Sequence, residues 1–366
     1  MTATPTSAGL FASLLAAAAL MLTGCGQPQP APASDAPPVE GEAANTQSSG
    51  RLNLYSARHY DADDAIYEAF EAETGIALRV LEAGGDLLLE RLRTEGEASP
   101  ADVIITVDAG RLWRAKNAGV FQPLETDAIL AATPARVRDP DNHWFGIAKR
   151  VRVHVIAPDR IDAAEVDTYE ALANPELEGR VCARTSANIY NLSLLAGLIE
   201  RWGPDRAEAW ATGVGRNLAR PPQGGDTDQI RAVAAGECDV ALVNHYYWAR
   251  LANSGSEADQ AVAAATQIVW PDQDGAGAHA NISGVGLAAN APNKDNAVRF
   301  IEYLLRPAVQ SQLGQSNNEF PVNPAASLDN PVLEALGAPV EEDINVSVYG
   351  GNQAEALAMF DRAGWP

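Results

Sequence analysis

The chain has 366 residues, of which 46% are apolar and 20% are charged, enough for a globular protein with more than one lobe. Its 48 acidic and 26 basic side chains give a net charge of −22 at pH 7, which argues against binding to nucleic acid or to anionic lipid head groups. The acidic surface is compatible with attraction of cations and also with the solubility of an exported protein.

The first 25 residues have the features of an export signal. Residues 10–22 are apolar, but this run is too short to span a bilayer, and it ends at Leu22-Thr23-Gly24-Cys25. This tetrapeptide resembles the bacterial lipoprotein cleavage box, in which the cysteine becomes lipidated and is the first residue of the mature protein. We therefore expect a signal peptide over residues 1–25 and a lipid anchor on Cys25. Residues 2–9 contain no Lys or Arg, and an ordinary apolar leader is the alternative.

Residues 26–50 are rich in Pro, Ala, Ser and Gly and contain no aromatic residue. Such a segment cannot bury enough apolar surface to fold, so we expect a disordered tether with a span of roughly 25–30 Å. The folded body therefore begins at residue 51.

From residue 51 onward, strand-like and helix-like patterns alternate. We predict strands at residues 52–56, 76–82 and 101–106, and helices at residues 64–74, 87–95 and 111–118. This alternation predicts an α/β fold with a mainly parallel sheet covered by helices.

Two further apolar runs, at residues 144–156 and 284–288, flank a second set of alternating elements. A chain that crosses twice between two lobes would have this pattern. We assign residues 51–150 and 278–325 to an N-lobe, and residues 151–277 and 326–366 to a C-lobe. Helices at residues 294–305 and 354–363 close the two lobes.

Two cysteines remain after Cys25, at positions 182 and 238. Cys182 lies in a strand-like run and Cys238 immediately precedes another, so a disulfide forms easily if these strands are neighbours in one sheet. The bond would close a loop of about 55 residues and stabilise the C-lobe by about 3–4 kcal/mol. Two buried free thiols are the alternative.

Tyrosines follow three of the strand-like runs. Because ligands of α/β folds bind beyond the carboxyl ends of the strands, we expect these phenols to meet in one cleft, with two neighbouring imidazoles. A set of phenolate oxygens with a little imidazole suits a hard, highly charged cation such as ferric iron. The side chains concerned are those of Tyr60, Tyr190, Tyr246, Tyr247, His59 and His245.

Tyr246 and Tyr247 are neighbours, and in a regular strand they would point to opposite faces of the sheet. Both can reach one ion only if the strand has ended before them and the backbone bends. A helix-like pattern from Trp248 onward makes this bend an expected feature.

The chain resembles the periplasmic ferric-ion-binding proteins of bacterial ABC importers, particularly the cyanobacterial branch. The resemblance extends over almost the whole body, from residue 51 to residue 366. Its most specific stretches are Leu54-Tyr55-Ser56-Ala57-Arg58-His59-Tyr60, Asn188-Ile189-Tyr190-Asn191, Pro222-Gln223-Gly224-Gly225-Asp226-Thr227, Asn244-His245-Tyr246-Tyr247 and Asn281-Ile282-Ser283-Gly284-Val285-Gly286.

The resemblance implies a two-lobed periplasmic binding protein fold of type II, with two crossover strands that form a hinge. It also implies Fe³⁺ as the transported ligand, and histidine participation varies within the family. The implied metal ligands are His59, Tyr60, Tyr190, Tyr246 and Tyr247. Three arginines near these positions, Arg58, Arg152 and Arg184, are candidates to offset the negative charge of the phenolates.

These features together predict a monomeric, lipid-anchored solute-binding protein outside the cytoplasm that delivers Fe³⁺ to an ABC permease. An anion-binding or small-organic-solute-binding protein of the same fold is the main alternative. An iron-dependent enzyme is the other, but the sequence has neither a His-Glu-x-x-His motif nor a Gly-x-Ser-x-Gly elbow. We therefore expect a protein that is not an enzyme.

Overall fold

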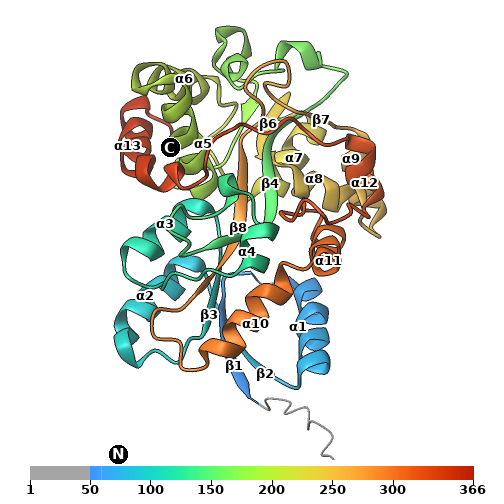
Figure 1. Cartoon of the computed structure of the whole chain (residues 1–366). Helices are drawn as coiled ribbons and strands as arrows, with labels where there is room; N and C mark the ends of the chain where they lie inside the picture. The colour runs from blue at the N-terminus through green and yellow to red at the C-terminus, as the bar shows by residue number, and fades with distance from the viewer. Residues whose placement is uncertain (1–49, 59) are drawn as a thin grey trace, which may run out of the picture. The chain divides into compact units, whose positions relative to one another are not determined.

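The computed structural model describes residues 50–58 and 60–366, which belong to one compact unit, Gln47–Pro366 (Figure 1). The expected signal peptide, Cys25 and the tether up to residue 49 lie outside the described residues, and so does His59. None of the described helices is both long enough and apolar enough to cross a membrane.

Eight strands form one sheet with the order β2-β1-β3-β8-β4-β6-β5, and β7 pairs with β4 beside this path. Figure 1 shows β4 and β8 side by side in the middle of the sheet. The strands are β1 (Arg51–Ser56), β2 (Ala77–Glu82), β3 (Val103–Val107), β4 (Phe145–Ile156), β5 (Val181–Cys182), β6 (Val240–Asn244), β7 (Gln267–Val269) and β8 (Ala280–Leu287).

The sheet is mixed, so the prediction of a mainly parallel sheet is wrong. Strand β1 pairs in parallel with β2 and β3, and β5 pairs in parallel with β6. Strand β8 runs antiparallel to β3 and β4, and β4 runs antiparallel to β6 and β7. The physical reason is that β4 carries the chain from the first set of strands to the second and β8 carries it back, so the two must run in opposite directions.

Strand β4 changes its hydrogen-bonding partner halfway along its length. Its first part, residues 145–151, pairs with β8, and its second part, residues 152–156, pairs with β6. Arg150 and Arg152 lie on either side of this change. Because side chains two residues apart point to the same face of a strand, both arginines project to one side of the sheet.

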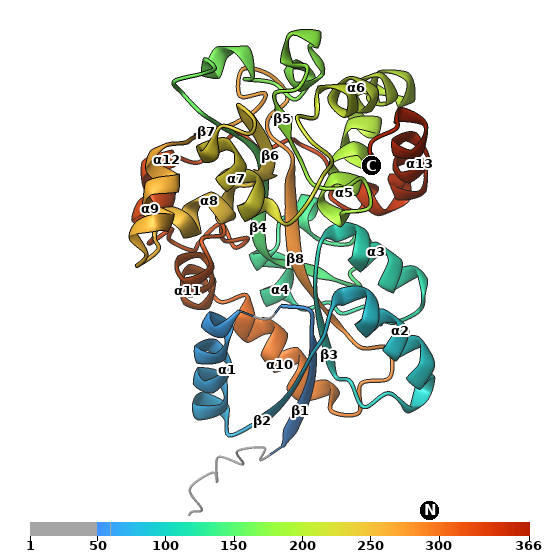
Figure 2. The same cartoon turned by 180° about the vertical axis from the view of Figure 1, so that it is seen from behind.

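Helices cover the sheet on both faces (Figures 1 and 2). The long C-terminal helix α13 packs against α5, α6 and α3, and α1 packs against α11. The helices are α1 (Asp61–Thr74), α2 (Gly85–Glu95), α3 (Ala109–Asn117), α4 (Asp127–Ala132), α5 (Ile189–Trp202), α6 (Pro204–Asn217), α7 (Asp226–Ala235), α8 (His245–Ala252), α9 (Glu257–Ala264), α10 (Lys294–Leu304), α11 (Pro307–Asn317), α12 (Pro331–Leu336) and α13 (Val348–Ala363).

Separate groups of buried apolar side chains lie at the two ends of the sheet. One joins β1 and β3 to α1 and α10, with Phe70 and Phe300 in edge-to-face contact at 4.9 Å between ring centroids. Another joins β4 and β6 to α7 and α8. The structure places a disulfide in this second group, between Cys182 of β5 and Cys238, with Cα atoms 5.9 Å apart. Strand β5 pairs directly with β6, so the two cysteines belong to neighbouring segments of one sheet.

We expect His154 of β4 to make the stability of the fold sensitive to acid. Burial lowers the pKa of its imidazole from 6.5 to about 4, and its Nδ1 lies 2.7 Å from the carbonyl oxygen of Val166. The unfolded chain therefore binds a proton near pH 6.5 that the folded chain does not bind until about pH 4. Stability is complete above the unfolded pKa and falls as the pH falls through this window, by at most about 1.4 kcal/mol per pH unit for one histidine.

Urea unfolding at about pH 7.5 and about pH 5 measures this dependence. The difference in the free energy of unfolding between the two pH values should be smaller in His154→Gln than in the wild type, because glutamine retains a donor for Val166 but has no proton to gain. An equal difference in both proteins would contradict a neutral buried imidazole.

Candidate metal centre

Two of the candidate tyrosines lie in the first turn of α8. Strand β6 ends at Asn244, and the helix begins at His245, three residues earlier than the expected Trp248. The expected end of the strand is therefore present, but Tyr246 and Tyr247 belong to the helix itself, where neighbouring side chains project about 100° apart. Their rings lie close together, with centroids 4.2 Å apart. Tyr246 is fully buried and Tyr247 is partly buried.

Tyr190 occupies the equivalent position in α5. Asn188 caps this helix, and its side-chain oxygen accepts a hydrogen bond from the Tyr190 backbone N–H at 3.1 Å. The phenol oxygen of Tyr190 lies 3.5 Å from that of Tyr246. The first turns of α5 and α8 therefore present their phenols to each other.

Tyr60 reaches the same group from the loop between β1 and α1, where it is the residue before the helix. The guanidinium of Arg250 connects it to the tyrosine pair: its central carbon lies 4.5 Å from the Tyr60 ring centroid, 4.9 Å from that of Tyr246 and 5.9 Å from that of Tyr247. The structure thus brings together all four candidate tyrosines.

Arg250 is a site residue that the sequence interpretation missed. It lies four residues after Tyr246 and three after Tyr247 in the same helix, which places it on the same face as the pair. This spacing is visible in the sequence, so the signal was available. A guanidinium over an aromatic face is attracted by the ring electrons, and more strongly by a phenolate charge.

The three predicted arginines also lie near the phenols. Arg58 is 4.8 Å from the Tyr60 ring centroid, and Arg152 and Arg184 are 5.9 and 5.7 Å from that of Tyr190. All three already have a buried carboxylate as partner. Arg58 pairs with Asp63 and Glu319, each at 2.9 Å. Asp226 is shared by the other two, at 2.8 Å from Arg152 and 3.7 Å from Arg184.

Arg150 is a second arginine that the sequence interpretation missed. It is buried, and its guanidinium carbon lies 6.0 Å from the Tyr190 ring centroid. One amino group donates to Ser283 Oγ at 2.5 Å, and Glu319 lies 3.8 Å away. Its Nε and Nη1 have no hydrogen-bond partner among the described residues. The signal in the sequence was its position two residues before Arg152, on the same face of β4.

His245 contributes to packing beside the phenols. It is fully buried, its ring stacks on Phe320 at 4.8 Å between centroids, and its Nδ1 accepts a hydrogen bond from the Val151 backbone N–H at 3.0 Å. Burial lowers the pKa of this imidazole to about 3, so the ring is neutral.

The electrostatic surroundings keep the tyrosine pair protonated. Burial raises the pKa of Tyr246 well above its usual 10, and the neighbouring phenols Tyr190, Tyr60 and Tyr247 raise it further. Burial also raises the pKa of Tyr247, with Tyr190 as the next contribution. Both phenols are therefore neutral near pH 7, and only a strong positive charge placed between them could deprotonate them.

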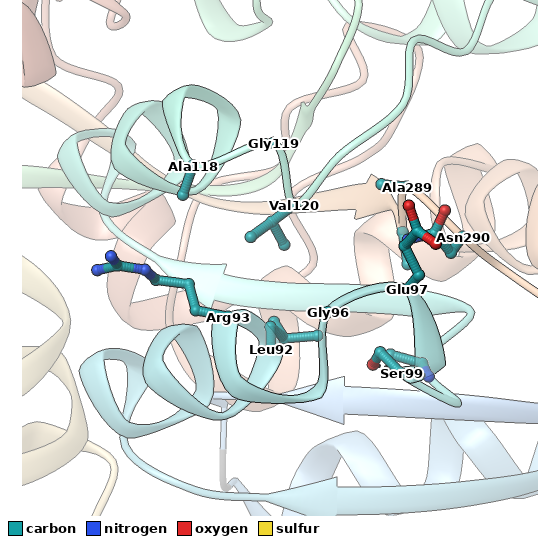
Figure 3. Close-up of a pocket in the computed structure, with 12 residues that line it drawn as sticks. Leu92, Arg93, Gly96, Glu97, Ser99, Ala118, Gly119, Val120, Ala289 and Asn290 are labelled. Atoms are coloured by element: carbon teal, nitrogen blue, oxygen red, sulfur yellow. Dashed lines mark hydrogen bonds between the residues drawn. The ribbon is translucent and has the colours of Figure 1, made fainter.

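Two other features of the described residues do not compete with this site. A cavity of about 480 Å³ lies between the end of α2 and the segments that follow α3 and β8 (Figure 3), and none of the four tyrosines lines it. The side chains of Asp139, Asp141 and His143 are close enough to hold a metal ion. The ammonium of Lys116 already lies 2.8 Å from Asp139 and 2.7 Å from Asp141, so a cation is present there without any metal.

Comparison with known proteins identifies the class to which this fold and site belong. Residues 98–340 match the family of bacterial extracellular solute-binding proteins. The iron uptake proteins A1 and A2 of Synechocystis are each 42% identical to this chain; the alignments cover 94% of the chain and 93% of A1, and 86% of the chain and 90% of A2.

Solved structures agree with this assignment. The Trichodesmium IdiA (FutA) protein, in complex with iron and citrate ligands, is 47% identical with a TM-score of 0.84, over 87% of this chain and 100% of that chain. Apo FutA2 from Synechocystis is 42% identical with a TM-score of 0.82, over 86% and 99% of the two chains.

The chain therefore belongs to the bacterial extracellular solute-binding proteins, and its fold is that of the type II periplasmic binding proteins. Within that family it stands with the relatives named for iron uptake and ferric iron binding. Proteins of this class bind solutes for transport and are not enzymes, as we expected from the sequence.

In the metal-free protein we expect Tyr246 and Tyr247 to stay protonated when ordinary tyrosines ionise, because burial raises both pKa values. The ultraviolet absorbance of tyrosinate, followed up to about pH 11, measures the number of phenols that ionise. The Tyr246→Phe/Tyr247→Phe variant should show the same amplitude as the wild type when folded and an amplitude lower by two tyrosines in denaturant. A loss of two tyrosines in the folded state as well would contradict the raised pKa values.

Proposed function

We propose that the protein captures Fe³⁺ through the phenolate oxygens of Tyr60, Tyr190, Tyr246 and Tyr247 and delivers it to an ABC permease. The observation that carries this proposal is the gathering of four tyrosine side chains, from three separate segments of the chain, around Tyr246 and the guanidinium of Arg250. The names of the relatives support ferric iron as the cargo. His59 would supply a fifth ligand from its position beside Tyr60.

The charge of the donor set favours the ferric ion. Four phenolates around Fe³⁺ have a net charge of −1, whereas the same ligands around Fe²⁺ have a net charge of −2 and gain less from hard oxygen. Arg58, Arg152 and Arg184 would offset the excess negative charge together with the two arginines that the structure adds, Arg150 and Arg250. Because each phenol must lose a proton to bind, affinity should fall as the pH falls.

The arrangement of the chain supports capture by closure of two lobes. We propose an N-lobe of residues 51–150 and 278–325, which carries Tyr60, and a C-lobe of residues 151–277 and 326–366, which carries the other three tyrosines. Strands β4 and β8 would form the hinge between them. Small-angle X-ray scattering tests the closure of the two lobes, because closure should decrease the radius of gyration when iron is added.

A visible absorption titration with chelated ferric iron tests the cargo. We expect a phenolate-to-iron charge-transfer band that saturates at one equivalent, and a shifted or weaker band in Tyr246→Phe. The matched control is Tyr303→Phe, since Tyr303 is also buried but donates its hydrogen bond to the Ile66 carbonyl, away from the four phenols. The control should titrate like the wild type.

The absence of a charge-transfer band in the wild type, together with tight binding of a colourless anion, would contradict the ferric proposal. It would instead identify an anion-binding protein of the same fold, in which Arg150 and the neighbouring arginines would be the natural ligands for the anion.

We further propose that a lipid on Cys25 holds the protein at a membrane outside the cytoplasm, as a monomer, near its permease. The proposal rests on the Leu22-Thr23-Gly24-Cys25 sequence and on the Pro-rich segment that follows. Cys25→Ala should move the protein from the membrane fraction to the soluble fraction and abolish metabolic labelling with a fatty acid. Recovery of the variant in the membrane fraction would contradict the anchor.

A further inference from the structure

Arg152 connects the two helices that carry the C-lobe tyrosines. Its side chain is 1% exposed, and its guanidinium donates in two directions. Nη2 donates to Asn191 Oδ1 at 2.6 Å, and Nη1 donates to Asp226 Oδ2 at 2.8 Å and, with a longer bond, to Asn244 Oδ1 at 3.4 Å. Asn191 follows Tyr190 in the first turn of α5, so one arm of Arg152 reaches the Tyr190 helix directly.

Asp226 completes the connection on the other side. It is fully buried as the first residue of α7, and its Oδ2 also accepts a hydrogen bond from the backbone N–H of Asn244 at 2.8 Å. Asn244 is the residue before α8, the helix that carries Tyr246 and Tyr247. A single carboxylate oxygen therefore holds both Arg152 and the start of the tyrosine-pair helix.

The contacts form a continuous path from one tyrosine-bearing turn to the other. It runs from Asn191 through Arg152 and Asp226 to Asn244, and every side chain in it is buried. The path is anchored at its α5 end, where the Asn191 amide donates to the carbonyls of Arg184 and Thr185 at 3.0 and 3.1 Å. The charged members of the path are Arg152 and Asp226, and the partly exposed Arg184 lies beside it, 3.7 Å from Asp226 Oδ1.

We infer that Asp226, acting through Arg152, is a positioning residue that sets the separation between the Tyr190 phenol and the phenols of Tyr246 and Tyr247. The inference rests on the proposed ferric function and deepens it, since the separation decides whether three phenolates can share one ion. Asp226 has this effect without contact with the metal.

Electrostatics alone predicts the opposite effect for this carboxylate. Entry of Fe³⁺ with the loss of four phenol protons changes the net charge of the site by −1. A neighbouring negative charge opposes such a change, so its removal would favour loading. A positioning role predicts a lower affinity for ferric iron. Removal of the Asp226 charge leaves the guanidinium of Arg152 buried without its counter-charge, so Arg152 shifts and moves α5 and α8 with it. The sign of the change in ferric affinity therefore separates the two roles.

The test uses the mature protein with chelated ferric iron, and the readouts are the affinity and the charge-transfer maximum. We expect Asp226→Asn to lower the affinity by about tenfold or more and to shift the band. Arg152→Lys should act in the same direction, because a single ammonium cannot span Asp226 and Asn191 as the guanidinium fork does. The matched control is Asp272→Asn, which removes the partner of Arg201 in another Arg–Asp pair at 2.8 Å and should leave affinity and band unchanged.

A double variant shows whether the two residues act as one unit. If Asp226 acts through Arg152, the affinity of Asp226→Asn/Arg152→Lys for ferric iron should be no lower than that of whichever single variant binds iron less tightly. Additive losses of affinity would overturn the inferred route. Wild-type or increased affinity in folded Asp226→Asn, with an unshifted band, would also overturn the inference. If Asp226→Asn does not fold by circular dichroism, Arg152→Lys decides alone, and wild-type behaviour overturns the inference. Absence of the band in the wild type is a different result, which rejects the ferric function itself.

Discussion

The burial of three arginines around the crossover strand β4 is the constraint on which the site depends. Arg58, Arg150 and Arg152 are each 1% exposed, and a guanidinium cannot escape the cost of burial by losing its proton. Each must therefore lie beside carboxylates or other acceptors. The carboxylates come from α1, from the segment after α11 and from the start of α7, namely Asp63, Glu319 and Asp226. Because each buried arginine needs a carboxylate from another part of the chain, these ion pairs determine which distant segments pack together.

The phenols of the candidate site lie beside these arginines. Burial, and the repulsion that neighbouring phenolates would exert on one another, keep Tyr246 and Tyr247 protonated, while the guanidinium of Arg150 favours the phenolate of Tyr246. Under the proposed function, this opposition gives selectivity: a weakly charged cation gains too little to displace buried phenol protons, whereas a trivalent ion gains enough. The same arginines would then stabilise the loaded state, so one set of buried charges serves both the fold and the site.

Much of this arrangement could be predicted from local patterns. Apolar periodicity located β1, β3, β4 and α10 to within a few residues, because each of these elements must present an apolar face to the core. The direction of β8 could not be predicted in this way. Local pattern identifies a strand, but its neighbours and their orientation depend on where the chain has travelled before it returns, so the mixed sheet was not foreseen.

Local sequence patterns were enough to establish the chemical character of the site. They are the strand ends followed by tyrosines, the cysteines next to strands and the family stretches around Tyr60, Tyr190 and Tyr246. Residue type and spacing are local properties, and they suffice to name donors and propose a cation. Which charged side chains lie beside those donors became visible only in the folded protein. Arg152, one of the arginines expected to offset the phenolate charge, is paired with Asp226, whereas Arg250 lies over the rings of three tyrosines. The physical reason is that electrostatic energy depends on distance and burial, and both arise only when segments far apart in the chain are packed together.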